Sequence, residues 1–188
     1  MPGDSRIGRS IDRHLAGLGH LAESAETIEH LAVAIERALA AGHKILTCGN
    51  GGSAAEALHL AEEMMGRFSK DRPPFAAVCL AADPAAMTCI SNDYGYDQVF
   101  SRQVRGLGRP GDVLVALSTS GKSINIVNAL EEARGIGLTT LGLLGRPGSP
   151  AEALCDIALT MPADASSHIQ ELHLIVIHLI LEHLDGTD

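Results

Sequence analysis

Five short apolar runs alternate with longer segments that carry apolar residues at helical spacing, and this alternation limits the fold most strongly. The runs are KILTCG (44–49), FAAVCLAA (75–82), DVLVALST (112–119), TTLGLLG (139–145) and CDIALTMP (155–162). Strands that are buried on both faces are continuously apolar, and the helices between them provide the cover. We therefore expect an α/β fold of three layers, α-β-α, around a central parallel sheet of about five strands.

Helices are expected on both sides of these runs in the sequence. Apolar residues at helical spacing over 10–41, followed by Gly42, predict one or two N-terminal helices. Ser53, with Glu56 three residues later, predicts a capping box at the start of the next helix. The remaining helices are expected over 53–67, 97–108, 123–137 and, as a long C-terminal helix, 166–184.

Length, composition and charge exclude several classes of protein. The chain has 188 residues, 46% of them hydrophobic and 20% charged, so we expect one soluble domain over 1–188, with about 1–42 as a helical extension. No run approaches the roughly 18 apolar residues of a membrane span, and the start carries no export signal. A net charge of −9 and the lack of Trp argue against a nucleic-acid partner. Four cysteines without a C-x-x-C pair favour a reducing cytoplasm.

Two loops rich in glycine and hydroxyl residues follow the first and third apolar runs. They are GNGGSAA, which starts at Gly49, and STSGKS over 118–123. Ligands of parallel α/β sheets bind beyond the carboxyl ends of the strands, where hydroxyls, backbone N–H groups and a helix dipole suit a phosphate. An ordinary capped turn is the alternative for either loop alone. A dinucleotide pattern, with Gly49, Gly51, Ala54 and Asp83, also stays open.

Two pairs of polar residues have the chemistry of metal ligands. His59 and Glu63 are four residues apart, so they share one helix face at a spacing that suits two ligands of one ion; a salt-bridged or solvated pair is the alternative. Gln170 and His178 form a second pair within an apolar helix. Burying an unpartnered imidazole costs about 1–3 kcal/mol, so His178 should have a partner, either in this site or at a backbone carbonyl. His173 is expected at the surface or an interface.

Four segments in this order resemble a known family: CGNGGSAAEALHLAEE, SNDYGYDQVFSRQV, GDVLVALSTSGKS and IQELHLIVIH. They are similar to the motifs of SIS (sugar isomerase) domain proteins and, among these, of the phosphoheptose isomerases. The resemblance implies a cytoplasmic homotetramer with sites at subunit interfaces and one Zn²⁺ per subunit. It further implies the conversion of a phosphorylated heptose, sedoheptulose 7-phosphate, to D-glycero-D-manno-heptose 7-phosphate.

The resemblance also implies roles for individual residues. The residues implied to contact the sugar phosphate are Asn50, Gly51, Gly52, Ser53, Glu63, Asn92, Asp93, Ser118, Thr119, Ser120, Ser123 and Gln170. The implied zinc ligands are His59, Glu63, Gln170 and His178, and Glu63 and His178 would handle protons. Asn92 and Asp93 are expected in a turn, for which a plain Asx-turn is the alternative. Ketose–aldose conversion through an enediol needs a base, an acid and a group that stabilises the oxyanion, which a carboxylate and an imidazole beside a metal can supply.

Two questions stay open on the sequence. Eight residues separate Gln170 from His178, which is about 12 Å along a helix axis, so we expect one of the two to come from a neighbouring subunit. The alternative function is a non-catalytic SIS-domain regulator that binds a sugar phosphate or a replication initiator. Such regulators lose the acid and base residues, so Glu63 and His178 favour catalysis.

Overall fold

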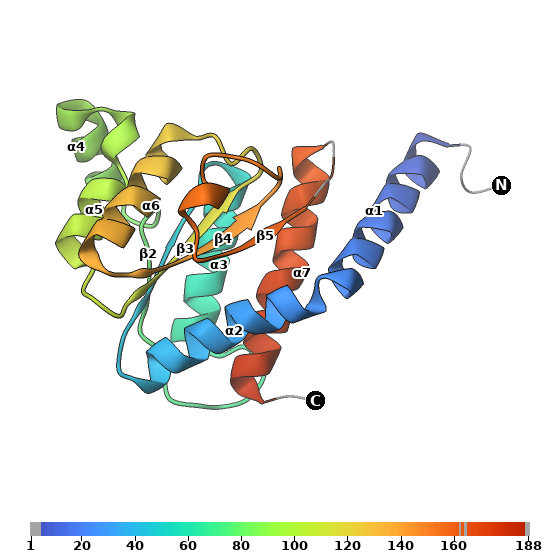
Figure 1. The fold of residues 1–188 in the computed structure, drawn as a ribbon, viewed down its shortest axis with the longest axis horizontal. Coiled ribbons are helices and arrows are strands. Elements are labelled where there is room, and N and C mark those ends of the chain that lie inside the picture. The colour runs from blue at the N-terminus through green and yellow to red at the C-terminus, as the bar shows by residue number, and fades with distance from the viewer. Residues whose placement is uncertain (1–4, 162, 164, 187–188) are drawn as a thin grey trace.

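The structure, a computed structural model that describes residues 5–161, 163 and 165–186, has a parallel sheet between two layers of helices (Figure 1). This confirms the predicted three-layer α/β class. The strands are β1 (Ile45–Cys48), β2 (Ala77–Cys79), β3 (Val113–Ser118), β4 (Thr139–Leu144) and β5 (Ile157–Thr160). Their order in the sheet is β2-β1-β3-β4-β5, and every neighbouring pair is parallel.

Seven α-helices and two short 3-10 helices are found in the described part of the chain. They are α1 (Arg6–Glu23), α2 (Ala25–Ala40), α3 (Gly52–Met65), α4 (Pro84–Tyr94), η2 (Tyr96–Gln98), α5 (Ser101–Leu107), α6 (Ile124–Ile136), η3 (Glu152–Leu154) and α7 (Ser166–Asp185). The N-terminal segment forms two helices, and α7 has the predicted bounds to within one residue. No helix among the described residues is long and apolar enough to cross a bilayer.

Each face of the sheet carries its own hydrophobic core, because successive residues of a strand point to opposite faces. On one face, Ile45 of β1 and Val115 of β3 pack with α2, α3 and α7. On the other, Leu46 and Leu114 pack with α5 and α6. All six residues of β3 are buried, which explains its unbroken apolar sequence.

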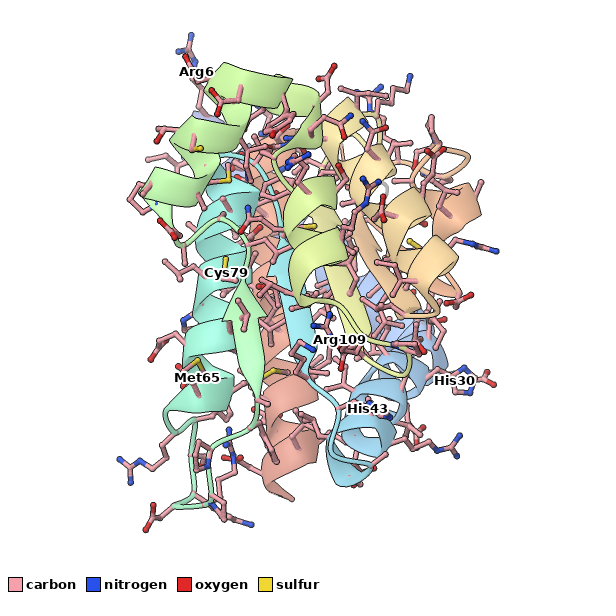
Figure 2. The ribbon with its side chains drawn as sticks, turned by 90° about the vertical axis from the view of Figure 1, so that its left-hand side faces the viewer. Arg6, His30, His43, Met65, Cys79 and Arg109 are labelled. Carbon is pink, nitrogen blue, oxygen red and sulfur yellow. The ribbon has the colours of Figure 1, made fainter. Side chains whose placement is uncertain are left out.

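The helix α4 was not predicted, and Asn92 and Asp93 lie in its last turn rather than in the expected turn. The Asp83 side chain accepts hydrogen bonds from the N–H groups of Ala85 and Ala86, and Pro84 occupies the first turn, which are the features of a strong helix start. Since Asp83 caps α4, the structure gives no support to its role in a dinucleotide site. Figure 2 shows α4 at the end of the molecule opposite His43 and Arg109.

The predicted capping box at Ser53 is wrong. The helix α3 begins one residue earlier, with Gly51 as its N-cap at φ +56°, and no side chain caps it. Only glycine enters this region without steric cost, so Gly51 turns the chain sharply from β1 into the helix. Glu56 is buried instead, with one carboxyl oxygen unpartnered, and burial raises its pKa to about 8.

His173 is fully buried, which corrects its expected place at the surface. Neither ring nitrogen has a hydrogen bond of normal geometry to the described residues. Burial lowers the pKa of His173 to about 4, and the carbonyl of Leu144 opposes part of that shift. The imidazole is therefore neutral in the folded protein at any pH near neutrality.

We expect His173 to make the protein acid-sensitive. Above pH 6.5 the ring is neutral in both the folded and the unfolded chain, but between pH 6.5 and pH 4 only the unfolded chain takes up the proton. The free energy of unfolding should therefore fall with pH in this window, by about 2 kcal/mol at pH 5 from this group alone. Urea unfolding at pH 7 and pH 5 checks this: the loss should be smaller in His173→Leu, and an equal loss in both proteins would contradict it.

Candidate active site

The two glycine- and hydroxyl-rich loops meet at the point where the order of the strands reverses. After β1 the chain builds β2 on one side, and β3 then pairs on the other side of β1. Cys48 and Ala116 are register partners, so the loops that follow β1 and β3 leave the same edge of the sheet side by side. Such a switch point is where ligands of open α/β sheets bind.

A small cavity of about 60 Å³ lies between these loops. Its lining is made mainly of hydroxyl and carboxamide side chains: Asn50, Ser53, Leu117, Ser118, Thr119, Ser120, Ser123 and Gln170. The structure thus brings together most of the residues that the sequence assigned to phosphate binding, and Gln170 arrives from α7. The N-terminus of α6 begins directly after Ser123, so backbone N–H groups and the helix dipole add to the hydroxyls.

The backbone of the second loop is folded by its own side chains. The Ser118 hydroxyl accepts a hydrogen bond from the N–H of Gly121 (3.0 Å), and the Ser120 hydroxyl accepts from the N–H of Lys122 (3.2 Å). Gly121 has φ +61°, and a Cβ there would lie 2.1 Å from the Ser149 hydroxyl oxygen. This position therefore requires glycine. Ser123 is the N-cap of α6, but its side chain makes no capping hydrogen bond, which leaves its hydroxyl free for a ligand.

Gly52 sets the distance between α3 and α7. A Cβ on Gly52 would lie 2.3 Å from Nε2 of Gln170, so only glycine lets the Gln170 carboxamide lie against the first turn of α3. Through this contact the C-terminal helix supplies a side chain to the loop that follows β1.

A second group of polar side chains lies further along α3 and α7. Nε2 of His59 is 3.1 Å from Nε2 of His178, and 3.8 Å from Oε1 of Glu63. On the other side of the ring, Nδ1 of His59 is 3.4 Å from Oε2 of Glu62. The ring of Phe68 stacks on His178, with centroids 5.6 Å apart, and holds that imidazole in place.

This group has the composition of a metal site. Candidate ligand atoms of His59, Glu62 and Glu63 all lie within 4.8 Å of one another. Two nitrogen ligands of one tetrahedral Zn²⁺, each about 2.05 Å from the ion, stand about 3.3 Å apart. The observed 3.1 Å between the His59 and His178 nitrogens is close to that value, and the Glu63 carboxylate borders the same space. Two imidazoles and a carboxylate therefore fit the ion.

Two of the residues predicted to contact the substrate, Asn92 and Asp93, do not line the hydroxyl cavity. Gln170 does line it, as expected of a substrate contact, and its role as a metal ligand stays a prediction. Asn92 and Asp93 are exposed at the end of α4, where the Asn92 amide donates to Asp93 (2.7 Å). Asn92 and Asp93 lie outside the cavity lining because they belong to α4, and the sequence pattern does not give the position of that helix relative to the sheet.

Sequence reasoning also missed polar residues that the structure places at the site. Asn125 in α6 exchanges two hydrogen bonds of 2.9 Å with Asn50, and the Tyr96 hydroxyl donates to Asn50 Oδ1 (2.8 Å). Glu62 joins the histidine group. Asn125 was within reach of prediction, because it follows the hydroxyl loop in the first turn of a helix. Tyr96 reaches Asn50 across 46 residues, and no local pattern signals that contact.

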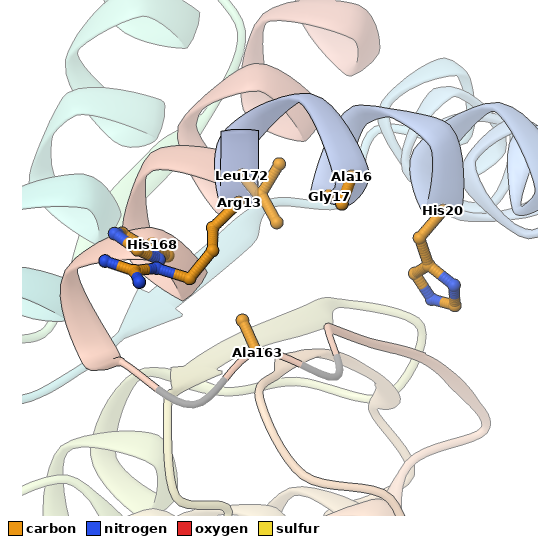
Figure 3. Close-up of a pocket in the computed structure, with 7 residues that line it drawn as sticks. All are labelled: Arg13, Ala16, Gly17, His20, Ala163, His168 and Leu172. Atoms are coloured by element: carbon orange, nitrogen blue, oxygen red, sulfur yellow. The ribbon is translucent and has the colours of Figure 1, made fainter. Parts of the chain in front are cut away.

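A separate cavity of about 260 Å³ lies between α1, α7 and the segment after β5 (Figure 3). Arg13 and His20 come from α1, and His168 comes from α7. The Ser10 hydroxyl lies 3.2 Å from Nε2 of His168. This cavity lies between α1 and the rest of the molecule, and none of its lining residues belongs to the hydroxyl cavity or the histidine group.

Comparison with known proteins assigns the chain to a family. The SIS domain family matches residues 13–145. The phosphoheptose isomerase of Bradyrhizobium sp. (strain ORS 278) is 47% identical over 187 residues, which are 98% of this chain and 94% of that protein. The chain belongs to the phosphoheptose isomerase family. The predicted resemblance is thereby confirmed.

Solved structures of phosphoheptose isomerases have the same fold. The enzyme from Neisseria gonorrhoeae is 38% identical, with a TM-score of 0.91 over 97% of this chain and 98% of that one. A phosphoheptose isomerase from Francisella tularensis is 32% identical, with a TM-score of 0.88 over 97% of this chain and 100% of that one. Because both alignments cover 97% of this chain, the α1 and α2 helices also belong to the shared fold.

Proposed function

We propose that this protein is a ketose–aldose isomerase that converts sedoheptulose 7-phosphate to D-glycero-D-manno-heptose 7-phosphate. The main support is that His59 and Glu63 of α3 lie close to His178 of α7, and that the same two helices also border the hydroxyl-lined cavity. The proposal combines this geometry with membership of the phosphoheptose isomerase family.

In this proposal the hydroxyl cavity holds the phosphate. The substrate contacts are Asn50, Gly51, Gly52, Ser53, Ser118, Thr119, Ser120, Ser123 and Gln170, to which we add Glu63, Asn92 and Asp93 for the sugar. A phosphate at this position would receive hydroxyl hydrogen bonds and the positive end of the α6 dipole. The negative net charge of the chain does not oppose this, because the site is local.

The spacing along α7 suits an extended sugar. Gln170 borders the phosphate cavity and His178 belongs to the histidine group, and their backbones are about 12 Å apart along the helix axis. An open-chain heptose 7-phosphate has its phosphate at one end and its reacting carbons, C1 and C2, at the other. Such a molecule can place its phosphate at the hydroxyl loops while C1 and C2 reach the acid and base.

Glu63 and His178 carry the proton transfers in our mechanism. The Glu63 carboxylate removes a proton from C1 of the ketose, which gives an enediol, and returns a proton to C2, which gives the aldose. The His178 imidazole gives a proton to the oxygen on C2 and takes one from the oxygen on C1, so the reaction is balanced in atoms and charge. Side chains of this kind typically contribute about 10²–10⁴-fold to such a step.

One Zn²⁺ per subunit fits the donor set described above. The residues that would hold it are His59, Glu63 and His178, and its charge would stabilise the negative charge that develops on the sugar oxygens. The family resemblance also implies Gln170 as a zinc ligand, but we assign Gln170 to the substrate because it lines the hydroxyl cavity.

We also propose a homotetramer with sites at subunit interfaces. The helix α1 extends from the body of the molecule (Figure 1) and exposes Ile7, Ile11, Leu15 and Leu18 at helical spacing, with Ile7 74% exposed. An apolar stripe of this size is typical of a subunit contact. Light scattering in solution tests the tetramer, and a monomeric mass would reject it. The four free cysteines fit a reducing compartment, so we propose a cytoplasmic location.

The direct experiment is to incubate the purified protein with sedoheptulose 7-phosphate and to follow the formation of the aldose phosphate. We expect steady conversion toward equilibrium. Absence of conversion, together with binding of the sugar phosphate, would favour the non-catalytic regulator instead. The presence of both Glu63 and His178 argues against that alternative.

Ser120→Ala tests the phosphate cavity. Removal of one hydroxyl that contacts the phosphate should weaken binding by about 0.5–1.5 kcal/mol, which is about 2- to 10-fold in KM. Ser24→Ala is the matched control, because Ser24 lies between α1 and α2, and its side chain makes no capping hydrogen bond. An unchanged affinity for the phosphorylated sugar in Ser120→Ala would count against this role.

A further inference from the structure

Asn50 is the residue at the hydroxyl cavity whose side chain is most completely held by other side chains. Its carboxamide exchanges two hydrogen bonds with Asn125, 2.9 Å each, and its Oδ1 also accepts the hydroxyl hydrogen of Tyr96 at 2.8 Å. A carboxamide offers two N–H donors and two acceptor sites on its oxygen. Both acceptor sites are therefore used, and one N–H is left over.

The remaining N–H of Asn50 is available to a ligand. Asn50 lines the cavity together with the hydroxyl loop, so the unused donor lies among the groups that suit a phosphate or a sugar hydroxyl. Its direction depends on the plane of the carboxamide, which the two partners fix from different sides. Asn125 is buried in α6, whereas Tyr96 is 53% exposed and comes from η2.

The segment that carries Tyr96 is itself tied to α6. The Asn128 side chain donates to the carbonyl of Asp97 (3.0 Å), next to Tyr96. The preceding helix α4 has no fully buried residue, and it packs against the core only through the partly buried Met87 and Ile90. The Tyr96–Asn50 hydrogen bond therefore joins this exposed corner of the molecule to the loop after β1.

We propose that Tyr96 is a positioning residue for the reaction: its hydroxyl holds the Asn50 carboxamide in the orientation that presents one N–H to the sugar phosphate. This inference rests on the proposed function and extends it to a residue that touches Asn50. Without the hydroxyl, one acceptor site of Asn50 is empty, and the carboxamide can turn toward water. A donor that is held in place before the ligand arrives binds more tightly than one that must be ordered on binding.

The chain supplies a matched pair of tyrosines for the test. Tyr96→Phe removes only the hydroxyl that meets Asn50. Tyr94→Phe makes the same change two residues away, where the ring lies over the guanidinium of Arg102, 3.5 Å from the ring centroid. We expect Tyr96→Phe to lower kcat/KM by about 2- to 10-fold, mainly through KM, and Tyr94→Phe to stay within about twofold of the parent protein.

A double-mutant cycle separates positioning from a general structural effect. If Tyr96 acts through Asn50, then Tyr96→Phe should have no further effect in an Asn50→Ala background. Full effects in both backgrounds, or equal behaviour of Tyr96→Phe and Tyr94→Phe, would overturn the inference. The affinity for inorganic phosphate gives the same comparison without turnover. It is measured by calorimetry on the parent protein, Tyr96→Phe, Asn50→Ala and the double variant. Failure of the isomerase proposal itself would give a different result, because the parent protein would then not convert the sugar phosphate.

Discussion

Glu63→Gln is expected to lower kcat for sedoheptulose 7-phosphate by about a hundredfold or more, because the amide keeps the size of the side chain but cannot accept a proton from carbon. Oε1 of Glu63 is 3.8 Å from Nε2 of His59, and the side chain is only 18% exposed, so it borders the space in which the sugar would react. KM should change much less than kcat, since the phosphate contacts are untouched.

The control for this substitution is Glu131→Gln, the same chemical change on an exposed position of α6. It should leave turnover within about twofold. Turnover of Glu63→Gln within a few fold of the parent protein would remove Glu63 from the role of base. Thermal unfolding of both variants verifies that neither result comes from loss of the fold.

Removal of the proposed Zn²⁺ is the second change with a large expected effect. Treatment with a chelator should lower turnover by at least about a hundredfold, because the oxyanion would lose its main source of positive charge. Added Zn²⁺ should restore the parent protein. His59→Ala should resemble the stripped protein and should not be restored by Zn²⁺, since it lacks a proposed ligand whose Nε2 lies 3.1 Å from Nε2 of His178.

The metal content of the purified protein tests the proposed site independently of activity. We expect one Zn²⁺ per chain in the parent protein and in His30→Ala, which changes an exposed histidine of α2 (Figure 2). His59→Ala should contain far less. Full activity of a protein shown to be free of metal would contradict the assignment of this group as a metal site.

The sequence was sufficient for the sheet, because the central strands β1, β3 and β4 are buried on both faces and are therefore almost continuously apolar. It was insufficient for α4, whose residues PAAMTCISNDY contact the core only through the partly buried Met87 and Ile90, too short an apolar pattern to indicate a helix. Asp83 followed by Pro84 is a typical helix N-terminus, so the capping residues alone could have predicted this helix. At Ser53 the opposite happened: a local capping pattern was present, but the φ of Gly51 let the helix begin earlier.

Within the site, helix geometry predicted the separation of Gln170 from His178 but not their partners. Gln170 lies at the hydroxyl cavity and His178 meets His59, and the contribution of a neighbouring subunit stays a prediction. His173 was misplaced because α7 is apolar nearly all round, so its sequence does not show which face contacts the sheet. Long-range contacts such as Tyr96 with Asn50 depend on the fold alone.

The central claim is that Glu63 and His178 move a proton between C1 and C2 of a seven-carbon sugar phosphate. Its most direct test is to supply the metal-loaded protein with sedoheptulose 7-phosphate in D₂O and to record proton NMR spectra of the sugar. We expect that an aldose heptose 7-phosphate forms and that part of it carries deuterium at C2, because the proton on Glu63 can exchange with solvent before it returns to carbon. No aldose phosphate, or an aldose formed at an undiminished rate by Glu63→Gln, would contradict it.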